Sequence, residues 1–196
     1  GAALGINPFD EPNVAEAKEK TKGLLNTFAS TGRLPEKSAT AASDGVSVFS
    51  PTFQGDSPAA VVRAALGSLQ AGDYVAILSY LPATSDVELL FGEIRESIRA
   101  TFRVASTFGV GPRYLHATGQ YHKGGPNTVL AFVATTDDDT STEIPEAGYS
   151  FSILKRAQAL GDAETLAAHS RRVVHLHLDG GMSIRALQDV FAQALG

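Results

Sequence analysis

The sequence predicts an α/β fold with an open, largely parallel sheet and helices on both faces. Strand-like and helix-like segments alternate from residue 46 to residue 195, an order typical of βαβ units. Two strand candidates, Tyr74–Leu81 and Thr128–Thr136, are almost uninterrupted apolar runs, as expected of strands that helices cover on both sides. At 196 residues, the chain fits one domain, or one domain with an attached piece.

The amino-terminal third predicts a helix followed by a linker. Pro12 suits a first helical turn, and Val14–Phe28 carries apolar residues at helical spacing. Residues 26–44 are rich in Ser, Thr, Gly, Pro and Ala and have no apolar period. We therefore expect a helical tail of an upstream domain over 1–30, a linker over 31–43 and an α/β domain over 44–196. The start at Gly1 without an initiator Met suggests that residues precede it.

The α/β part opens with two strands that alternate with two helices, the second strand being Tyr74–Leu81. Val46–Ser50 predicts the first strand, Ser57 and Pro58 a helix start, and Gly72 the end of that helix. Ser85–Glu88 fits a capping box. The positions after it that share helical spacing predict a core-facing stripe: Val87, Leu90, Phe91, Ile94, Ile98 and Phe102.

The second half continues the alternation. Strands are predicted at Val104–Val110, Thr128–Thr136 and Arg172–Leu178. Helices are predicted at Ser150–Leu160, Ala163–His169 and Ser183–Leu195, with Gly161-Asp162 separating the first two.

The segment Gly111–Asn127 holds the densest group of polar residues. It contains two of the five histidines and four of the nineteen glycines, and such segments between core elements are often functional. It begins after a strand, so we expect a site at the carboxyl edge of the sheet. A surface excursion whose glycines serve its turns is the alternative. The candidate site residues are Arg113, His116, Thr118, Gln120, His122 and Lys123.

Composition and motifs argue against several other functions. A net charge of −5 disfavours a nucleic-acid partner, and no apolar run approaches the ~20 residues of a membrane span. The lack of cysteine fits a cytoplasmic location. No nucleotide-binding glycine motif opens a helix. Asp137–Asp139 reads as a solvated loop, and His175 and His177 lack further ligands at metal-site spacing, so neither a metal nor a cofactor is expected.

Two stretches carry a family resemblance. Gly5–Val14, Gly-Ile-Asn-Pro-Phe-Asp-Glu-Pro-Asn-Val, with Lys18 one helical turn later, resembles the carboxy-terminal signature of phosphoglucose isomerase. The resemblance implies that Lys18 is the active-site lysine beside the sugar ring. Glu11, which stands where the family usually has Gln, becomes a substrate-binding candidate.

The second stretch points to a fusion protein. Gly111–Asn127, Tyr149–Phe151 and Leu154–Asp162 are similar to the final domain of bacterial bifunctional transaldolase/phosphoglucose isomerases. This resemblance implies a sugar-isomerase (SIS-type) three-layer α/β/α sandwich. It also implies a sugar-phosphate substrate, upstream isomerase and transaldolase domains as partners, and a homodimer as a candidate assembly.

The implied reaction interconverts glucose 6-phosphate and fructose 6-phosphate through a cis-enediol, without metal or nucleotide. It belongs to glycolysis, gluconeogenesis and the pentose phosphate pathway. Lys18 is the catalytic residue by motif, and His122 resembles the ring-opening histidine. The family's base glutamate and phosphate loop have no match here, so we expect this chain alone to be inactive. The alternative is a non-catalytic domain that binds sugar phosphate or packs against its neighbours.

Overall fold

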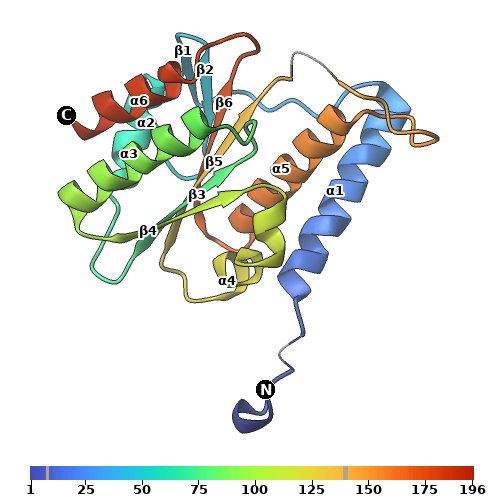
Figure 1. Ribbon diagram of the computed structural model, residues 1–196, viewed down its shortest axis with the longest axis horizontal. Helices are drawn as coiled ribbons and strands as arrows, with labels where there is room; N and C mark the ends of the chain where they lie inside the picture. The colour runs from blue at the N-terminus through green and yellow to red at the C-terminus, as the bar shows by residue number, and fades with distance from the viewer. Residues whose placement is uncertain (8, 139–140) are drawn as a thin grey trace.

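The computed structural model describes residues 1–7, 9–138 and 141–196 and forms one sheet between two helical layers (Figure 1). Its helices are η1 (Ala2–Leu4), α1 (Pro12–Thr31), α2 (Pro58–Leu66), α3 (Ser85–Phe102), η2 (Arg113–His116), α4 (Gly119–Gly124), α5 (Phe151–Ala168) and α6 (Arg185–Leu195). Its strands are β1 (Ala41–Ser43), β2 (Val46–Phe49), β3 (Tyr74–Ser79), β4 (Ala105–Val110), β5 (Val129–Thr136) and β6 (Arg172–Leu178).

The sheet confirms the predicted α/β class. Its six strands run in the order β1-β2-β6-β5-β3-β4. The four strands from β6 to β4 are parallel, whereas β1 and β2 add an antiparallel edge. β5 is buried along nearly its whole length, which explains its continuous apolar sequence.

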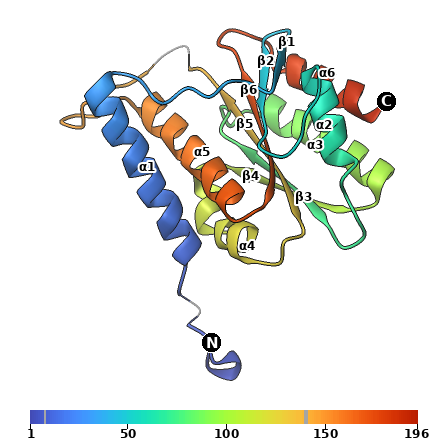
Figure 2. The same cartoon turned by 180° about the vertical axis from the view of Figure 1, so that it is seen from behind.

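Helices cover both faces of this sheet. α2, α3 and α6 lie on one face, and α1, α4 and α5 lie on the other (Figures 1 and 2). The predicted stripe of α3 is buried in the first layer, where Phe91 and Ile98 are at most 1% exposed. α1 packs against α5 rather than against the sheet, through Leu24 and Ala157.

Helix ends follow local capping chemistry with two corrections. Ser57 caps α2 as predicted, because its side chain accepts a hydrogen bond from the Ala60 amide at 3.2 Å. That helix ends at Leu66 instead of Gly72. The cap of α3 is Thr84, whose hydroxyl accepts from the Val87 amide at 3.4 Å. Ser85 is therefore the first residue of that helix rather than its cap.

Three segments are more ordered than the sequence suggested. α5 is one continuous helix, because Gly161 faces α1 and Asp162 is buried instead of ending a turn. α1 extends to Thr31, and β1 lies inside the stretch expected to be a linker. The segment 111–127 folds largely into η2 and α4. Within the described residues, no helix is long and apolar enough to cross a membrane.

Candidate functional site

The segment 111–127 crosses from one end of the sheet to the other. It leaves β4 at the carboxyl end, where the Gly111 amide donates to the Ser79 carbonyl at 2.7 Å. It ends at the amino end of β3, where the Tyr74 hydroxyl lies 2.8 Å from His122 Nδ1. A connection between parallel strands must make this return. The expected position at the carboxyl edge is therefore wrong for His122 and Lys123.

The inner side of α4 rests on a buried ion pair. The Lys123 ammonium group contacts the Asp162 carboxylate of α5, and both side chains are 0% exposed. The Tyr114 hydroxyl of η2 donates a hydrogen bond to the same carboxylate. Burial lowers the pKa of Lys123 to about 8 and raises the pKa of Asp162 to about 8, since it disfavours both charges. The pair nevertheless carries no net charge, because Lys123 and Asp162 share one titratable proton. The pair is neutral whichever of the two groups holds it.

Arg171 closes the carboxyl end of α4. Its Nε and Nη2 atoms donate to the Lys123 carbonyl at 3.0 and 2.5 Å, and Nη2 donates to the Gly125 carbonyl at 2.7 Å. The last carbonyls of a helix have no partner inside the helix, so the guanidinium group supplies one. This contact allows a short helix with glycine at both ends to persist.

His122 is part of the packing in this structure. Its side chain is 2% exposed, and its ring lies against Tyr74 and Tyr114. Burial lowers the pKa of His122 to about 4 and raises the pKa of Tyr74 to about 12. The Tyr74 hydroxyl group therefore keeps its proton and shares a hydrogen bond with a neutral imidazole. The catalytic role of His122 stays a prediction, and it requires the ring to be uncovered.

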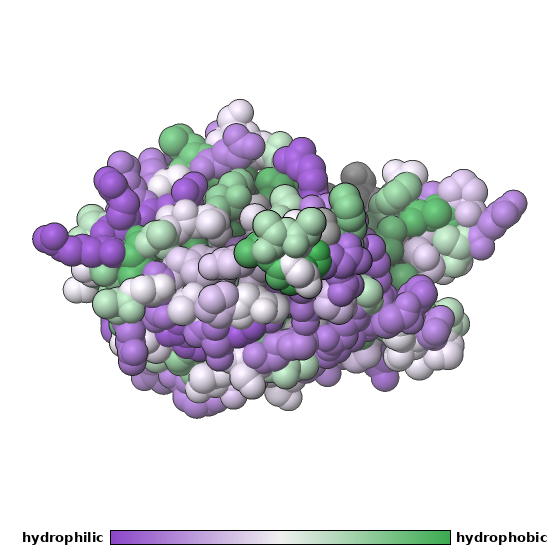
Figure 3. Space-filling view, turned by 90° about the horizontal axis from the view of Figure 1, so that it is seen from below, coloured by the Kyte–Doolittle hydropathy of each residue, from purple (hydrophilic) through white to green (hydrophobic). Residues whose placement is uncertain are grey.

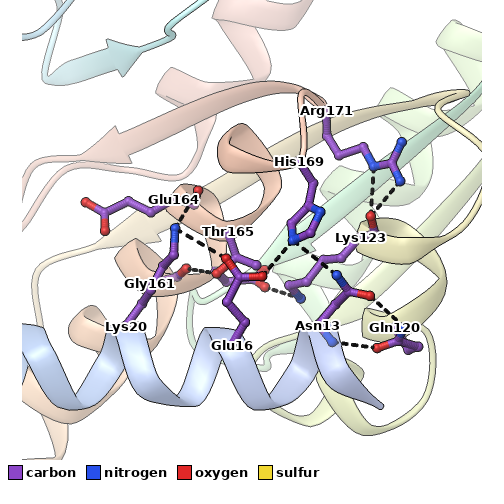
Figure 4. A network of polar contacts seen from close by, with 11 residues as sticks. Asn13, Glu16, Lys20, Gln120, Lys123, Gly161, Glu164, Thr165, His169 and Arg171 are labelled. Atoms are coloured by element: carbon purple, nitrogen blue, oxygen red, sulfur yellow. Dashed lines mark hydrogen bonds and ion pairs between the residues drawn. The ribbon is translucent and has the colours of Figure 1, made fainter. Parts of the chain in front are cut away.

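A second polar network joins α4 to α1 (Figure 4). The Asn13 amide donates to Gln120 Oε1 at 3.1 Å, and Gln120 Nε2 donates to Asn13 Oδ1 at 2.7 Å. Next to them, His169 Nε2 lies 2.6 Å from Glu16 Oε2. The hydrogen bond from His169 holds the pKa of Glu16 below its usual value. The network thus fixes the amino half of α1 against the end of α5.

The other predicted site residues face solvent. Arg113, His116 and Thr118 are exposed. Lys18 projects from α1 with a 56% exposed side chain, and its Nζ atom lies 3.6 Å from Glu11 Oε1. The structure therefore brings Gln120, His122 and Lys123 inward and leaves Lys18 and Glu11 as a separate exposed pair.

Metal binding receives no support. Among the described residues, no group of three or more His, Asp and Glu side chains is placed to hold an ion. Asp137 and Asp138 form ion pairs with Arg156 and Lys155 of α5, so these carboxylates are paired rather than merely solvated. Asp139, the third of the run, lies outside the described residues.

Several residues of these polar networks were not predicted as site residues from the sequence. Tyr114 lay within the segment 111–127, but its partner Asp162 lies 48 residues further along the chain. Asp162 was interpreted as part of a break between two helices. An acidic residue inside a helical pattern can also indicate a buried ion pair. His169 and Arg171 follow the end of α5, and no local pattern predicted their polar contacts.

Comparison with known proteins supports the fold alone. No family model matches the chain, and no curated protein matches its sequence. A hypothetical protein from Thermus thermophilus, solved by crystallography, superimposes with a TM-score of 0.60 at 19% identity. The match covers 71% of this chain and 39% of that one, so this chain spans about two fifths of its neighbour's length. The likeness agrees with an α/β sheet flanked by helices.

Proposed function

We propose that this chain is the carboxy-terminal part of a phosphoglucose isomerase that is fused to a transaldolase. One observation carries the proposal. Asn13 belongs to the first stretch that resembles the family and Gln120 to the second, and the two residues form reciprocal hydrogen bonds across 107 residues of sequence. Two stretches that serve one site should meet in the fold, whereas unrelated likenesses have no reason to do so.

Lys18 is the catalytic residue of this proposal. Its ammonium group is exposed beside the carboxylate of Glu11, which leaves it free to contact a sugar bound against the amino half of α1. A cation there stabilises the negative oxygen that develops as the sugar passes through the enediolate. The carboxylate that moves the proton between C1 and C2 is assigned to upstream residues.

The alternative is a non-catalytic domain that binds sugar phosphate or packs against a neighbour. The burial of His122 and Lys123 favours it, since their exposed fractions are only 2% and 0%. The amino-terminal segment also favours it, because Leu4, Ile6 and Phe9 are 76%, 58% and 89% exposed. Seen from below, apolar groups gather at the centre of a mostly hydrophilic face, where this segment projects (Figure 3).

Titration of the chain with fructose 6-phosphate tests the proposal. We expect the backbone amide resonances of Asn13, Lys18 and Gln120 to shift together in NMR spectra. Lys18→Ala should weaken this binding about tenfold, the size of one lost charge-assisted hydrogen bond. Lys22→Ala is the control, because Lys22 lies one turn further along α1 and pairs with Glu19 instead.

Three outcomes of this titration distinguish the isomerase proposal from the non-catalytic alternative. Loss of binding in Lys18→Ala but not in Lys22→Ala supports the isomerase proposal. Binding that neither variant changes favours the non-catalytic alternative. The absence of any shift at about 10 mM ligand, a concentration that saturates even a millimolar site, contradicts a sugar-phosphate site in this chain.

A further inference from the structure

A cavity of about 920 Å³ lies on the α5 face of the sheet, away from Asn13 and Gln120. Phe49 of β2 and His175 and His177 of β6 form its floor, and α5 forms one wall. The opposite wall is the segment 32–40, which runs from the end of α1 towards β1 (Figure 2). This volume is in the range of small-molecule sites, and no function assigned above uses it.

A hydrogen-bonded chain runs along the floor of the cavity. Thr135 Oγ1 lies 2.7 Å from His175 Nε2 and 2.9 Å from His177 Nδ1. His177 Nε2 in turn lies 3.5 Å from Asp137 Oδ2. Register explains the group, because Thr135 is the cross-strand partner of His177. The sequence alone showed only two histidines on one face.

These hydrogen bonds determine which ring nitrogens of His175 and His177 carry protons. Burial lowers the pKa of His175 to about 3 and also lowers the pKa of His177, so both rings are neutral at neutral pH. The carboxylate of Asp137 repels a lone pair and therefore favours the proton on His177 Nε2. His177 Nδ1 then accepts the single hydroxyl proton of Thr135, and Thr135 accepts from His175 Nε2. Nδ1 of His175 is left as an acceptor.

Several cationic side chains gather around this acceptor in an acidic protein. Lys20, Arg33, Lys37 and Arg156 line the cavity, against Glu36 and Glu164. The chain as a whole carries a net charge of −5. Three of the four cations are paired with carboxylates, Lys37 with Glu164, Lys20 with Glu16 and Arg156 with Asp137, so an anionic ligand group would compete with Glu164 for Lys37. Phe49 stacks on His175 with ring centroids 5.2 Å apart, which gives the floor an apolar surface beside the acceptor.

We propose that the cavity is a ligand site for a small polyhydroxylated anion, with a ligand hydroxyl group donating to His175 and the anionic group facing Lys37. A sugar phosphate and a sugar acid share this chemistry. The site is independent of the proposed isomerase role, because its residues lie outside segments 5–18 and 111–127. Lys37 is well placed to report on it: its side chain is 58% exposed, and Nζ contacts Glu164 at 2.7 Å.

Calorimetric titration with glucose 6-phosphate, gluconate and inorganic phosphate tests this site. We expect one of the two hydroxylated anions to bind at least tenfold more tightly than inorganic phosphate, and the stronger one identifies the class. His175→Phe keeps the stack on Phe49 but removes the acceptor, so it should weaken that binding about tenfold. Lys37→Met should weaken it several-fold through the lost charge without touching the core.

Arg99→Met is the matched control, since it removes a cation from α3 on the opposite face of the sheet. Equal affinity for all three ligands, or no binding of either hydroxylated anion, overturns the proposal. So does binding that His175→Phe and Lys37→Met both leave unchanged. A sugar phosphate that shifts the amides of α1 but not those of β6 supports the isomerase site and contradicts this one.

Discussion

Replacing Lys123 with methionine should lower the free energy of unfolding by about 3–5 kcal/mol at neutral pH, because the Asp162 carboxyl group stays buried without its partner. Methionine has a similar length and flexibility, so the effect isolates the charge. For a chain of this size the melting temperature should fall by about 10 °C. Thermal and urea unfolding followed by circular dichroism measure both quantities.

The loss should depend on pH with a defined sign. Burial raises the pKa of Asp162 to about 8 in the folded state, against about 4 in an unfolded chain. A raised folded-state pKa contributes stability that is fully present below the unfolded value and is lost as the pH rises through the folded value. The stability of Lys123→Met should therefore rise as the pH falls from about 8 towards 4, because its buried Asp162 carboxyl group is protonated in the folded state.

Lys22→Met is the control for this prediction. Lys22 pairs with Glu19 on the surface of α1, where both side chains are 69% exposed, and surface pairs contribute little. If Lys123→Met were no more destabilising than this control, the buried pair would add nothing to stability. α4 would then depend on its contacts with Arg171, Asn13 and Tyr74.

Helices and strands could be predicted where the local pattern of apolar residues matches their burial in the folded protein. β5 could be predicted because a strand buried on two faces has a continuous apolar sequence. α3 could be predicted because a helix buried on one face has apolar residues at helical spacing. α4 has no such signal. It has glycine at both ends, and it is held by Asp162 and Arg171, which lie 39 and 48 residues further along the chain. No window of sequence around α4 contains either partner.

The candidate site was predictable only in part for a related reason. The segment 111–127 was singled out for its density of polar residues, yet its position required the topology of the β4–β5 connection. Thr135 joins two histidines only through the register of β5 on β6. Local chemistry could therefore be read from the sequence, whereas the partners of each group depended on which strands lie side by side.

The second large effect is expected at the contact between α1 and α5. Gly161 lies where α1 approaches closely, and an added Cβ atom would come within 2.9 Å of Thr21 Oγ1 and 3.3 Å of the Ala17 carbonyl oxygen. Gly161→Val should therefore destabilise the fold by about 1–3 kcal/mol, the usual range for overpacking. Because backbone atoms of α1 are among the contacts, the whole helix must move.

Amide hydrogen exchange locates that change, and Gly23→Val supplies the control. Gly23 lies within α1, but an added Cβ atom there meets nothing within 4 Å, so the same substitution should change stability little. In Gly161→Val the amides of α1 should lose protection while those of β3 and β5 keep theirs, because α1 packs on α5 and not on the sheet. Equal protection in both variants would show that the close approach at Gly161 is not needed. Loss confined to α1 would instead show that this contact holds α1 in place. Both proposed sites would then depend on it, since α1 carries Lys18 and leads into the segment that walls the cavity.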